Sequence, residues 1–231
     1  MSVEFTAMSD EIDPDAPDSK LTRSKKRWAE EGRFLTGTTA PPESQRLPPG
    51  QHQVRNWPVL DLGVQPQVSH ERWQLKLFGA VEHPAVWTWE QFLSQPQSQS
   101  TSDIHCVTTW SRYDNHWDGV ATRDVLVAVQ PRDDVRFVVL HSHDGYTTNM
   151  ALDDFASPHA LLAHRWEGEP LTAEHGGPAR LVVPHLYFWK SAKWIRGIEF
   201  RARDARGYWE VRGYHNHADP WKEERYSDSE T

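Results

Sequence analysis

The sequence has a single cysteine, Cys106, and no apolar run that approaches the ~20 residues of a membrane-spanning helix. One cysteine cannot form an intramolecular disulfide, so the chain fits a reducing compartment without requiring one. Basic residues are also in deficit, because 25 Lys and Arg face 33 Asp and Glu, for a formal net charge of −8. This balance argues against nonspecific nucleic-acid binding, in which Lys and Arg must neutralise phosphates. We therefore expect neither a membrane span nor a nucleic-acid partner.

The first residues of the chain also lack the features of a secretory signal. Residues 1–5 contain no basic region that leads into an apolar run, and twin arginines do not occur there. Together with the single cysteine, this predicts a cytoplasmic location.

Composition divides the chain into three parts. Residues 1–46 are polar and contain several prolines, which predicts a disordered or extended N-terminal arm. Residues 47–226 are predicted to form one folded domain, and residues 227–231 a flexible tail. A domain of this size buries roughly 70% of the surface of its unfolded chain. The 12 tryptophans should supply much of that burial, with their indole N–H groups at the rims of the core or of a pocket.

Hydrophobic periodicity predicts many strands and few helices. A short helix is expected from residue 88 or 89 to 93, and another over 123–129 with Thr122 as its N-cap. This pattern favours an α+β fold with mixed β-sheets and short helices over a doubly wound sheet. The predicted strands are 72–79, 85–89, 100–107, 135–141, 147–150, 180–183 and 195–201.

Cys106 lies where an apolar strand gives way to a polar, aromatic segment that is predicted to be a loop. A lone cysteine is most often a small buried hydrophobe, but a loop that leaves a strand end is a common place for a reactive group. His105 is a poor candidate for a base that activates the thiol, because adjacent strand residues point to opposite faces. A metal–thiolate bond needs no such base, since the metal itself favours deprotonation.

A second segment, residues 174–184, combines a glycine–proline turn with an apolar strand. Gly176 and Gly177 expose backbone N–H groups that can form an anion-binding concavity. Arg180, at the start of the strand, can bind a phosphate with two parallel hydrogen bonds. On this segment alone, an ordinary turn with a surface His175 and Arg180 is the preferred interpretation.

Two further segments and the histidine pairs complete the candidates. Residues 188–195 place two lysines and a serine among three aromatic residues, which suits an anionic ligand or an amphipathic stretch whose lysine stems cover apolar surface. Residues 52–59 say little alone. The His-x-His pairs at 141–143 and 215–217 have no companion cysteine at ligand spacing, so no structural zinc site is predicted.

Taken in order, these four segments resemble the sulfite oxidase family, in particular the bacterial oxidoreductases with a single molybdopterin-binding domain. The resemblance covers about residues 47–221 and implies a sulfite-oxidase-type molybdopterin-binding fold. It also implies a molybdenum–molybdopterin cofactor whose metal is bound by the Cys106 thiolate, a ligand type that suits a covalent metal–sulfur site.

The same resemblance assigns the remaining site residues. Tyr146 would donate a hydrogen bond to an oxygen of the substrate or metal centre, and Arg55 or Arg112 would steer an anion. Catalytic roles therefore fall on Cys106, Tyr146 and Arg55. The implied cofactor-binding residues are Val54, Arg55, Asn56, Trp57, Cys106, Asp144, His175, Gly176, Arg180, Ser191, Ala192 and Lys193.

By resemblance, the activity is transfer of an oxygen atom to or from a small substrate, with electrons exchanged with a separate partner because no haem-binding domain is present. The residues after Cys106 lack paired arginines for sulfite, so a sulfoxide or another oxo-acceptor is equally open. Two alternatives remain: a non-catalytic molybdopterin-binding or carrier protein, and an interaction module with a buried thiol. The sequence leaves the oligomeric state open.

Overall fold

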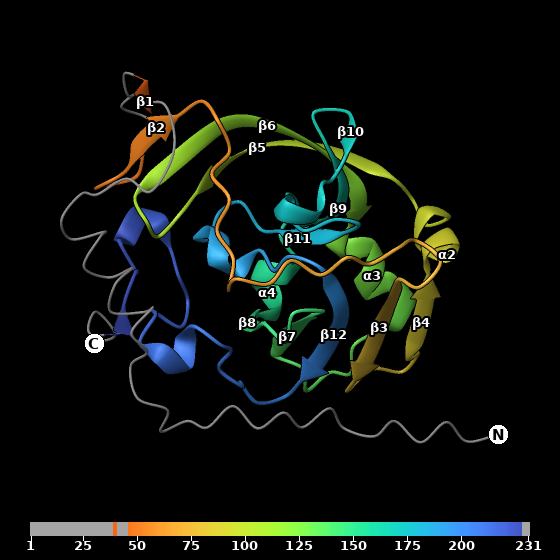
Figure 1. Cartoon of the computed structure of the whole chain (residues 1–231). Helices are drawn as coiled ribbons and strands as arrows, with labels where there is room; N and C mark the ends of the chain where they lie inside the picture. Colours follow the sequence, from red (N-terminus) through yellow and green to blue (C-terminus); the bar gives the residue numbers. More distant parts are fainter. Residues whose placement is uncertain (1–38, 41–45, 228–231) are drawn as a thin grey trace.

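The computed structural model describes residues 39–40 and 46–227, which form two β-sheets joined by short helices (Figure 1). The predicted disorder of residues 1–46 and the predicted flexibility of residues 227–231 lie outside this part, apart from three described arm residues and Ser227. Two of those arm residues form β1 (Thr39–Ala40), which pairs antiparallel with β2 (His52–Val54). In the described part, no helix has the length and apolar character to cross a membrane.

The first sheet is built around β6 (Trp110–Ala121), a 12-residue strand that arches over the molecule beside β5 (Ser98–His105) (Figure 1). Its main path runs β1-β2-β6-β9-β10, while β5 pairs with β6 and β11 pairs with β9. The strands that join β1 and β2 in this sheet are β5 (Ser98–His105), β6 (Trp110–Ala121), β9 (Leu161–Trp166), β10 (Glu169–Pro170) and β11 (Arg180–Val182).

The second sheet has the order β4-β3-β12-β7-β8, with β12 parallel to β3 and antiparallel to β7. Leu75 and Leu77 of β3 are fully buried, whereas their neighbours Gln74 and Lys76 are exposed, so one face of this sheet packs on the core and the other is polar. Its strands are β3 (Gln74–Gly79), β4 (Ala85–Thr88), β7 (Phe137–Ser142), β8 (Thr147–Ala151) and β12 (Ile195–Arg201).

Helices are short, as the α+β fold class predicts, and that fold class is confirmed. α2 (Trp89–Leu93) begins with a capping box in which Thr88 and Gln91 each accept a hydrogen bond from the other's backbone N–H. The other helical segments are α3 (Thr122–Val129), α4 (Leu152–Phe155) and the 3₁₀ turns η1 (Ala173–His175), η2 (Phe188–Lys190), η3 (Glu210–Arg212) and η4 (Pro220–Lys222).

Two local predictions are wrong. The hydroxyl of Thr122 does not cap α3. It is fully buried and donates to the carbonyl oxygens of Phe155 and Ala160, and these hydrogen bonds connect the start of α3 to the segment at the end of α4. The aromatic segment after Cys106 is not a long loop, because β6 starts at Trp110 after only three loop residues.

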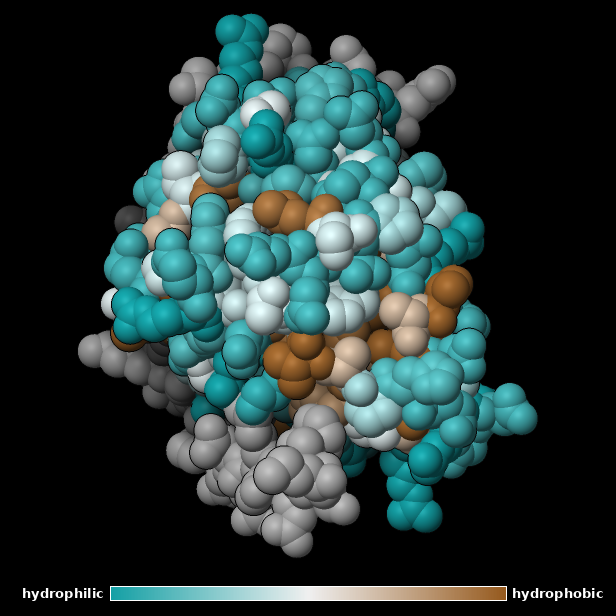
Figure 2. Space-filling model, turned by 90° about the vertical axis from the view of Figure 1, so that its right-hand side faces the viewer, coloured by the Kyte–Doolittle hydropathy of each residue, from teal (hydrophilic) through white to brown (hydrophobic). Residues whose placement is uncertain are grey.

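Tryptophans fill much of the core, and Trp73, Trp117 and Trp194 are almost completely buried. Several indole N–H groups find partners, as expected of buried tryptophan: Trp194 donates to the Ala173 carbonyl at 2.7 Å and Trp117 to the Ser102 hydroxyl at 3.1 Å. On the side that carries α2 and β4, the surface is hydrophilic over most of its area, with apolar groups interspersed (Figure 2).

Candidate active site

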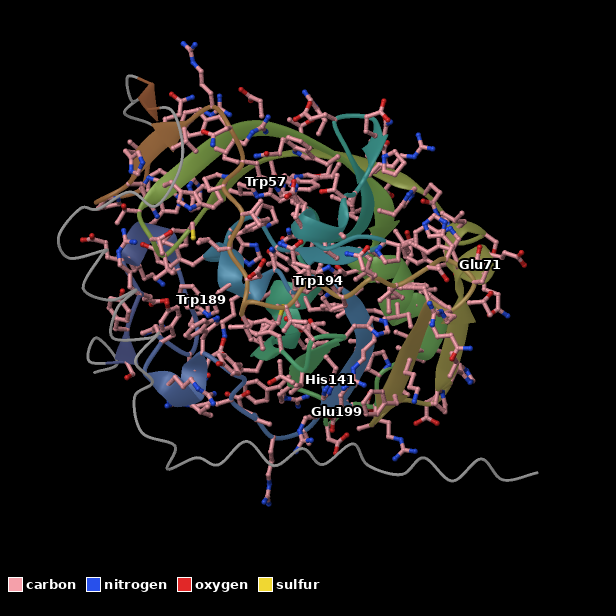
Figure 3. All side chains as sticks on the ribbon, in the orientation of Figure 1. Trp57, Glu71, His141, Trp189, Trp194 and Glu199 are labelled. Carbon is pink, nitrogen blue, oxygen red and sulfur yellow. The ribbon has the colours of Figure 1, made fainter. Side chains whose placement is uncertain are left out.

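A cavity lies between segments that are distant in the sequence, and its lining combines aromatic, charged and thiol-bearing residues. Trp57, Trp189 and Trp194 approach its region from two of these segments (Figure 3). The lining residues fall within 57–62, 106–110, 142–146, 175–194 and 209–214.

Cys106 reaches this cavity at the turn of the β5–β6 hairpin. Its backbone N–H donates to the Trp110 carbonyl at 2.8 Å, and its own carbonyl accepts from the Thr109 N–H at 3.0 Å. Thr109 has a left-handed φ of 74°, as the last residue of a three-residue hairpin loop commonly does. The Gln51 side-chain amide also donates to the Cys106 carbonyl at 3.0 Å. The backbone that carries the thiol is therefore fixed from both sides.

Cys106 lines the cavity, and the residue is 6% exposed. Its sulfur lies 3.1 Å from the Thr108 hydroxyl. His105 does not contact the thiol through its Nδ1, which forms a hydrogen bond with the Ser111 hydroxyl at 2.8 Å. Burial lowers the pKa of His105 to about 4. This arrangement suits a metal ligand better than a nucleophile activated by its neighbour.

Arg180 is a buried cation at the first position of β11. Its guanidinium donates to the carbonyl oxygens of His175 and Ser191, each at 2.8 Å, and lies 4.3 Å from the centre of the Phe188 ring. No carboxylate of the described residues pairs with it, and burial alone lowers the pKa of Arg180 to about 9. Because Arg180 also lines the cavity, an anionic ligand would complement its charge.

The turn before Arg180 is closely packed against other segments and is not exposed on the surface. Gly176 has a φ of +99°, and a Cβ there would lie 2.8 Å from the Lys193 Cβ, so only glycine fits. The turn places His175 against Trp57, with ring centres 3.9 Å apart in a stacked arrangement. Burial is the main cause of the lowered pKa of His175. The segment is thus a wall of the cavity and not an ordinary surface turn.

Ser191, Ala192 and Lys193 line the same cavity. The Ser191 hydroxyl accepts the backbone N–H of Val183 at 2.9 Å, which anchors the segment to the end of β11. The Lys193 ammonium donates to the Glu174 carbonyl at 2.7 Å. This lysine therefore closes the turn and adds a second positive charge to the lining.

Asp144 and Tyr146 enter the cavity from the turn between β7 and β8. The Asp144 carboxylate accepts the backbone N–H of Tyr146 at 3.0 Å, and burial raises the pKa of Asp144. The Tyr146 hydroxyl donates to the Trp189 carbonyl at 2.6 Å, and burial raises the pKa of Tyr146 well above its usual value. The tyrosine therefore stays protonated and can act only as a hydrogen-bond donor or neutral acceptor.

The structure does not bring every predicted residue to this cavity. Val54 is buried in β2, and Arg55 and Asn56 are exposed; none of the three contributes to the lining, and neither does Gly176. Arg112 also lies outside it and covers the Trp166 ring at 4.6 Å. Roles for these residues in catalysis or cofactor binding stay predictions.

Sequence reasoning missed part of the lining and its support. Trp209 and Tyr214 reach the cavity from the C-terminal segment, where tryptophan and tyrosine content is the only signal. Behind Trp189, the Lys190 ammonium lies 2.7 Å from a Glu210 carboxylate oxygen, and both side chains are fully buried. The same Glu210 oxygen accepts the Trp189 indole N–H at 3.0 Å, so this ion pair holds one wall of the cavity.

Polar atoms of the lining fit an oxygen-rich anionic cofactor. The Trp110 indole nitrogen and the Ser142 hydroxyl are buried and have no hydrogen-bond partner among the described residues, although both residues line the cavity. Buried polar groups normally have partners, so a ligand that supplies acceptors would satisfy them. A thiol for a soft metal, a buried cation for an anion and an aromatic-walled cavity together define a site for an anionic metal cofactor.

Comparison with known proteins agrees with this class. The family described as the oxidoreductase molybdopterin binding domain matches residues 62–209, and the chain belongs to that family. It is a molybdopterin-dependent oxidoreductase of the sulfite oxidase family, with molybdenum and molybdopterin as its cofactor.

Relatives span several oxidoreductases. The chain is 45% identical over 186 residues to the uncharacterized oxidoreductase YuiH of Bacillus subtilis, covering 80% of this chain and 94% of that protein. It is 27% identical to the protein-methionine-sulfoxide reductase catalytic subunit MsrP of Campylobacter jejuni, over 61% of this chain and 52% of MsrP. The crystal structure of the sulfane dehydrogenase SoxCD from Paracoccus pantotrophus shares the fold, with a TM-score of 0.56, 22% identity, and coverage of 60% of this chain and 40% of that one.

Proposed function

We propose that the protein transfers an oxygen atom to or from a small substrate and exchanges the accompanying electrons with a separate redox partner. When bound, the molybdenum–molybdopterin cofactor supplies the two-electron change that such a transfer requires. The observation that carries the proposal is the placement of the Cys106 thiol and the Arg180 guanidinium on the walls of one cavity.

The protein's own residues hold and orient the cofactor. Cys106 supplies the thiolate for the metal, from a backbone fixed by the hairpin bonds to Thr109 and Trp110. Arg180 binds the phosphate of the pterin, because its charge has no carboxylate partner in the described part of the chain. Lys193 adds positive charge nearby, and His175 forms part of the wall by stacking on Trp57.

The lining favours an uncharged substrate over sulfite. Trp110, Trp189, Trp209 and Tyr214 line the cavity together with the thiol, whereas Arg55 and Arg112 lie outside the lining. A mainly aromatic environment disfavours an anion that is not paired with a cation. A sulfoxide or an N-oxide is therefore the proposed substrate class, and the sulfoxide reductase relative supports testing sulfoxides first.

Metal content and turnover test the proposal together. We expect about one molybdenum per chain in the purified wild-type protein and loss of the metal in Cys106→Ser, because serine is a poor ligand for a soft site. Ser100→Ala is a matched control on β5, the strand that leads to Cys106, where the hydroxyl is buried without a hydrogen-bond partner in the described part. This control should keep its molybdenum.

Turnover of the molybdenum-loaded protein is then followed with a reduced dye and a series of sulfoxides and N-oxides, and with an oxidised dye and sulfite. Faster turnover of sulfite than of every sulfoxide and N-oxide would overturn the substrate class. A loaded protein that turns over none of these compounds would overturn oxygen-atom transfer itself.

A further inference from the structure

A second cavity lies on the polar face of the β4-β3-β12-β7-β8 sheet. Figure 3 shows two residues of this region, His141 of β7 and Glu199 of β12, close together on neighbouring strands. The lining consists of Arg72, Gln74, Lys76, Phe78, His141, His143, Arg196 and Gly197.

Gly197 opens this cavity because it has no side chain on the central strand. Lys76 and His141 are its register partners on the two neighbouring strands. The rings of Phe78 and His141 stand on either side, with centres 5.7 Å apart. A Cβ at Gly197 would lie 3.4 Å from Phe78 and 3.5 Å from His141, so a side chain larger than alanine would fill the hollow.

The charge of this cavity is opposite to that of the whole chain. Its lining contains the cations Arg72, Lys76 and Arg196 and no carboxylate, whereas the chain carries a net charge of −8. Glu199 is the nearby acid, and its carboxylate is already paired with His141 at 3.2 Å and with Arg201. The positive charge of the cavity is therefore available to a ligand.

Two nitrogen atoms of this lining also need a partner. The Arg196 Nε and the His143 Nε2 are buried, and neither has a hydrogen-bond partner among the described residues. A buried donor that stays unsatisfied is destabilising, so oxygen atoms of an anion would stabilise this arrangement. Burial and the charge of Arg196 lower the pKa of His143, and its neutral ring can carry its proton on Nε2.

We infer that this cavity binds a phosphate-class oxyanion, either inorganic phosphate or the end of a phosphomonoester, through Arg196, Lys76 and His143. The ligand would lie behind the wall of the cofactor cavity. The backbone N–H of His143 donates to the Trp194 carbonyl at 2.9 Å, and Trp194, Ser142 and Asp144 line that first cavity. The two sites thus share the β7–β8 turn and the start of β12 but no lining residue.

Calorimetric titration of the molybdenum-loaded protein at constant ionic strength tests this inference, with inorganic phosphate in one arm and glycerol phosphate in the other. We expect one site in the wild-type protein and about tenfold weaker binding in Arg196→Gln and in Lys76→Gln, because each loses one charge-assisted hydrogen bond. Arg203→Gln makes the same charge change at an exposed position outside the lining and should bind as the wild type does.

Gly197→Val distinguishes a cavity from a charged surface, because it fills the hollow without changing charge. It should also weaken binding, while thermal unfolding checks that each variant is folded. Binding of glycerol phosphate alone would support a phosphomonoester, and binding of both would support any phosphate group. No binding of either compound, or unchanged affinity in Arg196→Gln or in Gly197→Val, would overturn the inference. So would binding that Arg180→Gln abolishes and Arg196→Gln leaves intact.

Discussion

Arg180 and Lys190 are two fully buried cations on adjacent segments, and the protein treats them differently. Lys190 is paired with Glu210 at 2.7 Å and also donates to the Asn149 carbonyl at 2.8 Å. Arg180 donates hydrogen bonds only to carbonyl oxygens among the described residues, and it lines the cofactor cavity, which Lys190 does not. One charge is neutralised within the protein, and the other is left for a ligand.

The difference separates structural from functional charge. Removing an ion from water costs several kcal/mol even after relaxation, and a buried partner offsets that cost only with good geometry. In the Lys190–Glu210 pair, Thr148 and Trp189 also donate to the carboxylate oxygen that faces Lys190, whereas the other oxygen of Glu210 is buried without a hydrogen-bond partner among the described residues. Arg180 has no carboxylate partner in the described part of the chain, so its cost is offset when an anionic cofactor binds. A buried cation without a counter-charge is therefore the stronger indication of a ligand site.

Breaking the ion pair is expected to have the largest effect. Lys190→Met leaves Glu210 charged and buried, which should lower the free energy of unfolding by about 3–5 kcal/mol. Replacing both partners, as in Lys190→Met with Glu210→Leu, should recover most of this loss, because no charge is then left unpaired. Chemical denaturation of the cofactor-free protein measures both changes. A single variant as stable as the wild type would remove the contrast between the two cations.

Arg180→Gln should act on the cofactor more than on the fold. Loss of a charged hydrogen bond to the pterin phosphate is expected to cost roughly 1.5–3 kcal/mol of cofactor binding, or about tenfold to a hundredfold in affinity. The cofactor-free protein should lose less, because the arginine's own desolvation cost disappears with it. Molybdenum content after dialysis, compared with unfolding of loaded and cofactor-free protein, separates the two effects.

Arg165→Gln is the control for this variant, since Arg165 is exposed, binds one backbone carbonyl and lies outside the cavity. It should keep its molybdenum. Full occupancy in Arg180→Gln would show that this arginine does not hold the cofactor, and an equal loss of stability with and without cofactor would make Arg180 a structural cation like Lys190.

Local pattern explains which elements could be predicted. β12 was predicted with its observed bounds because its buried apolar residues, Ile195, Ile198 and Phe200, alternate with partly exposed polar residues, and α2 because Thr88 and Gln91 form a recognisable cap. β6 was missed although its burial alternates, because Ser111 and Asn115 occupy inward positions and hide the hydrophobic period.

The site follows the same division. Segments that carry Cys106, His175 and Arg180 have recognisable local sequence, and the structure brings all three to one cavity. Trp209 and the Lys190–Glu210 pair reach the site only through the fold, and no local sequence pattern indicates them. Lys190 and Glu210 are 20 residues apart in the sequence. Pairing between distant segments depends on topology, which the periodicity of a single strand does not contain.

Tyr146 connects the cofactor cavity with the region of the Lys190–Glu210 ion pair, and removal of its hydroxyl is expected to have the smallest effect. Its hydroxyl donates to the carbonyl of Trp189, whose indole donates to Glu210. Tyr146→Phe should keep molybdenum, lose roughly 0.5–1.5 kcal/mol of stability for one hydrogen bond, and slow turnover about tenfold, because the single hydroxyl proton can turn from the Trp189 carbonyl to the substrate. Steady-state kinetics and metal analysis of the same preparation measure these outcomes.

Thr122→Val provides the comparison for Tyr146→Phe, because it removes a buried hydroxyl that donates to backbone carbonyls at a position outside the cavity. The two variants should lose similar stability, but only Tyr146→Phe should slow turnover, and the slowing should persist across neutral pH because the raised pKa of Tyr146 keeps its hydroxyl protonated. Equal turnover in both variants would assign Tyr146 to the structural region with Glu210, and would leave the chemistry to the cofactor and to Cys106.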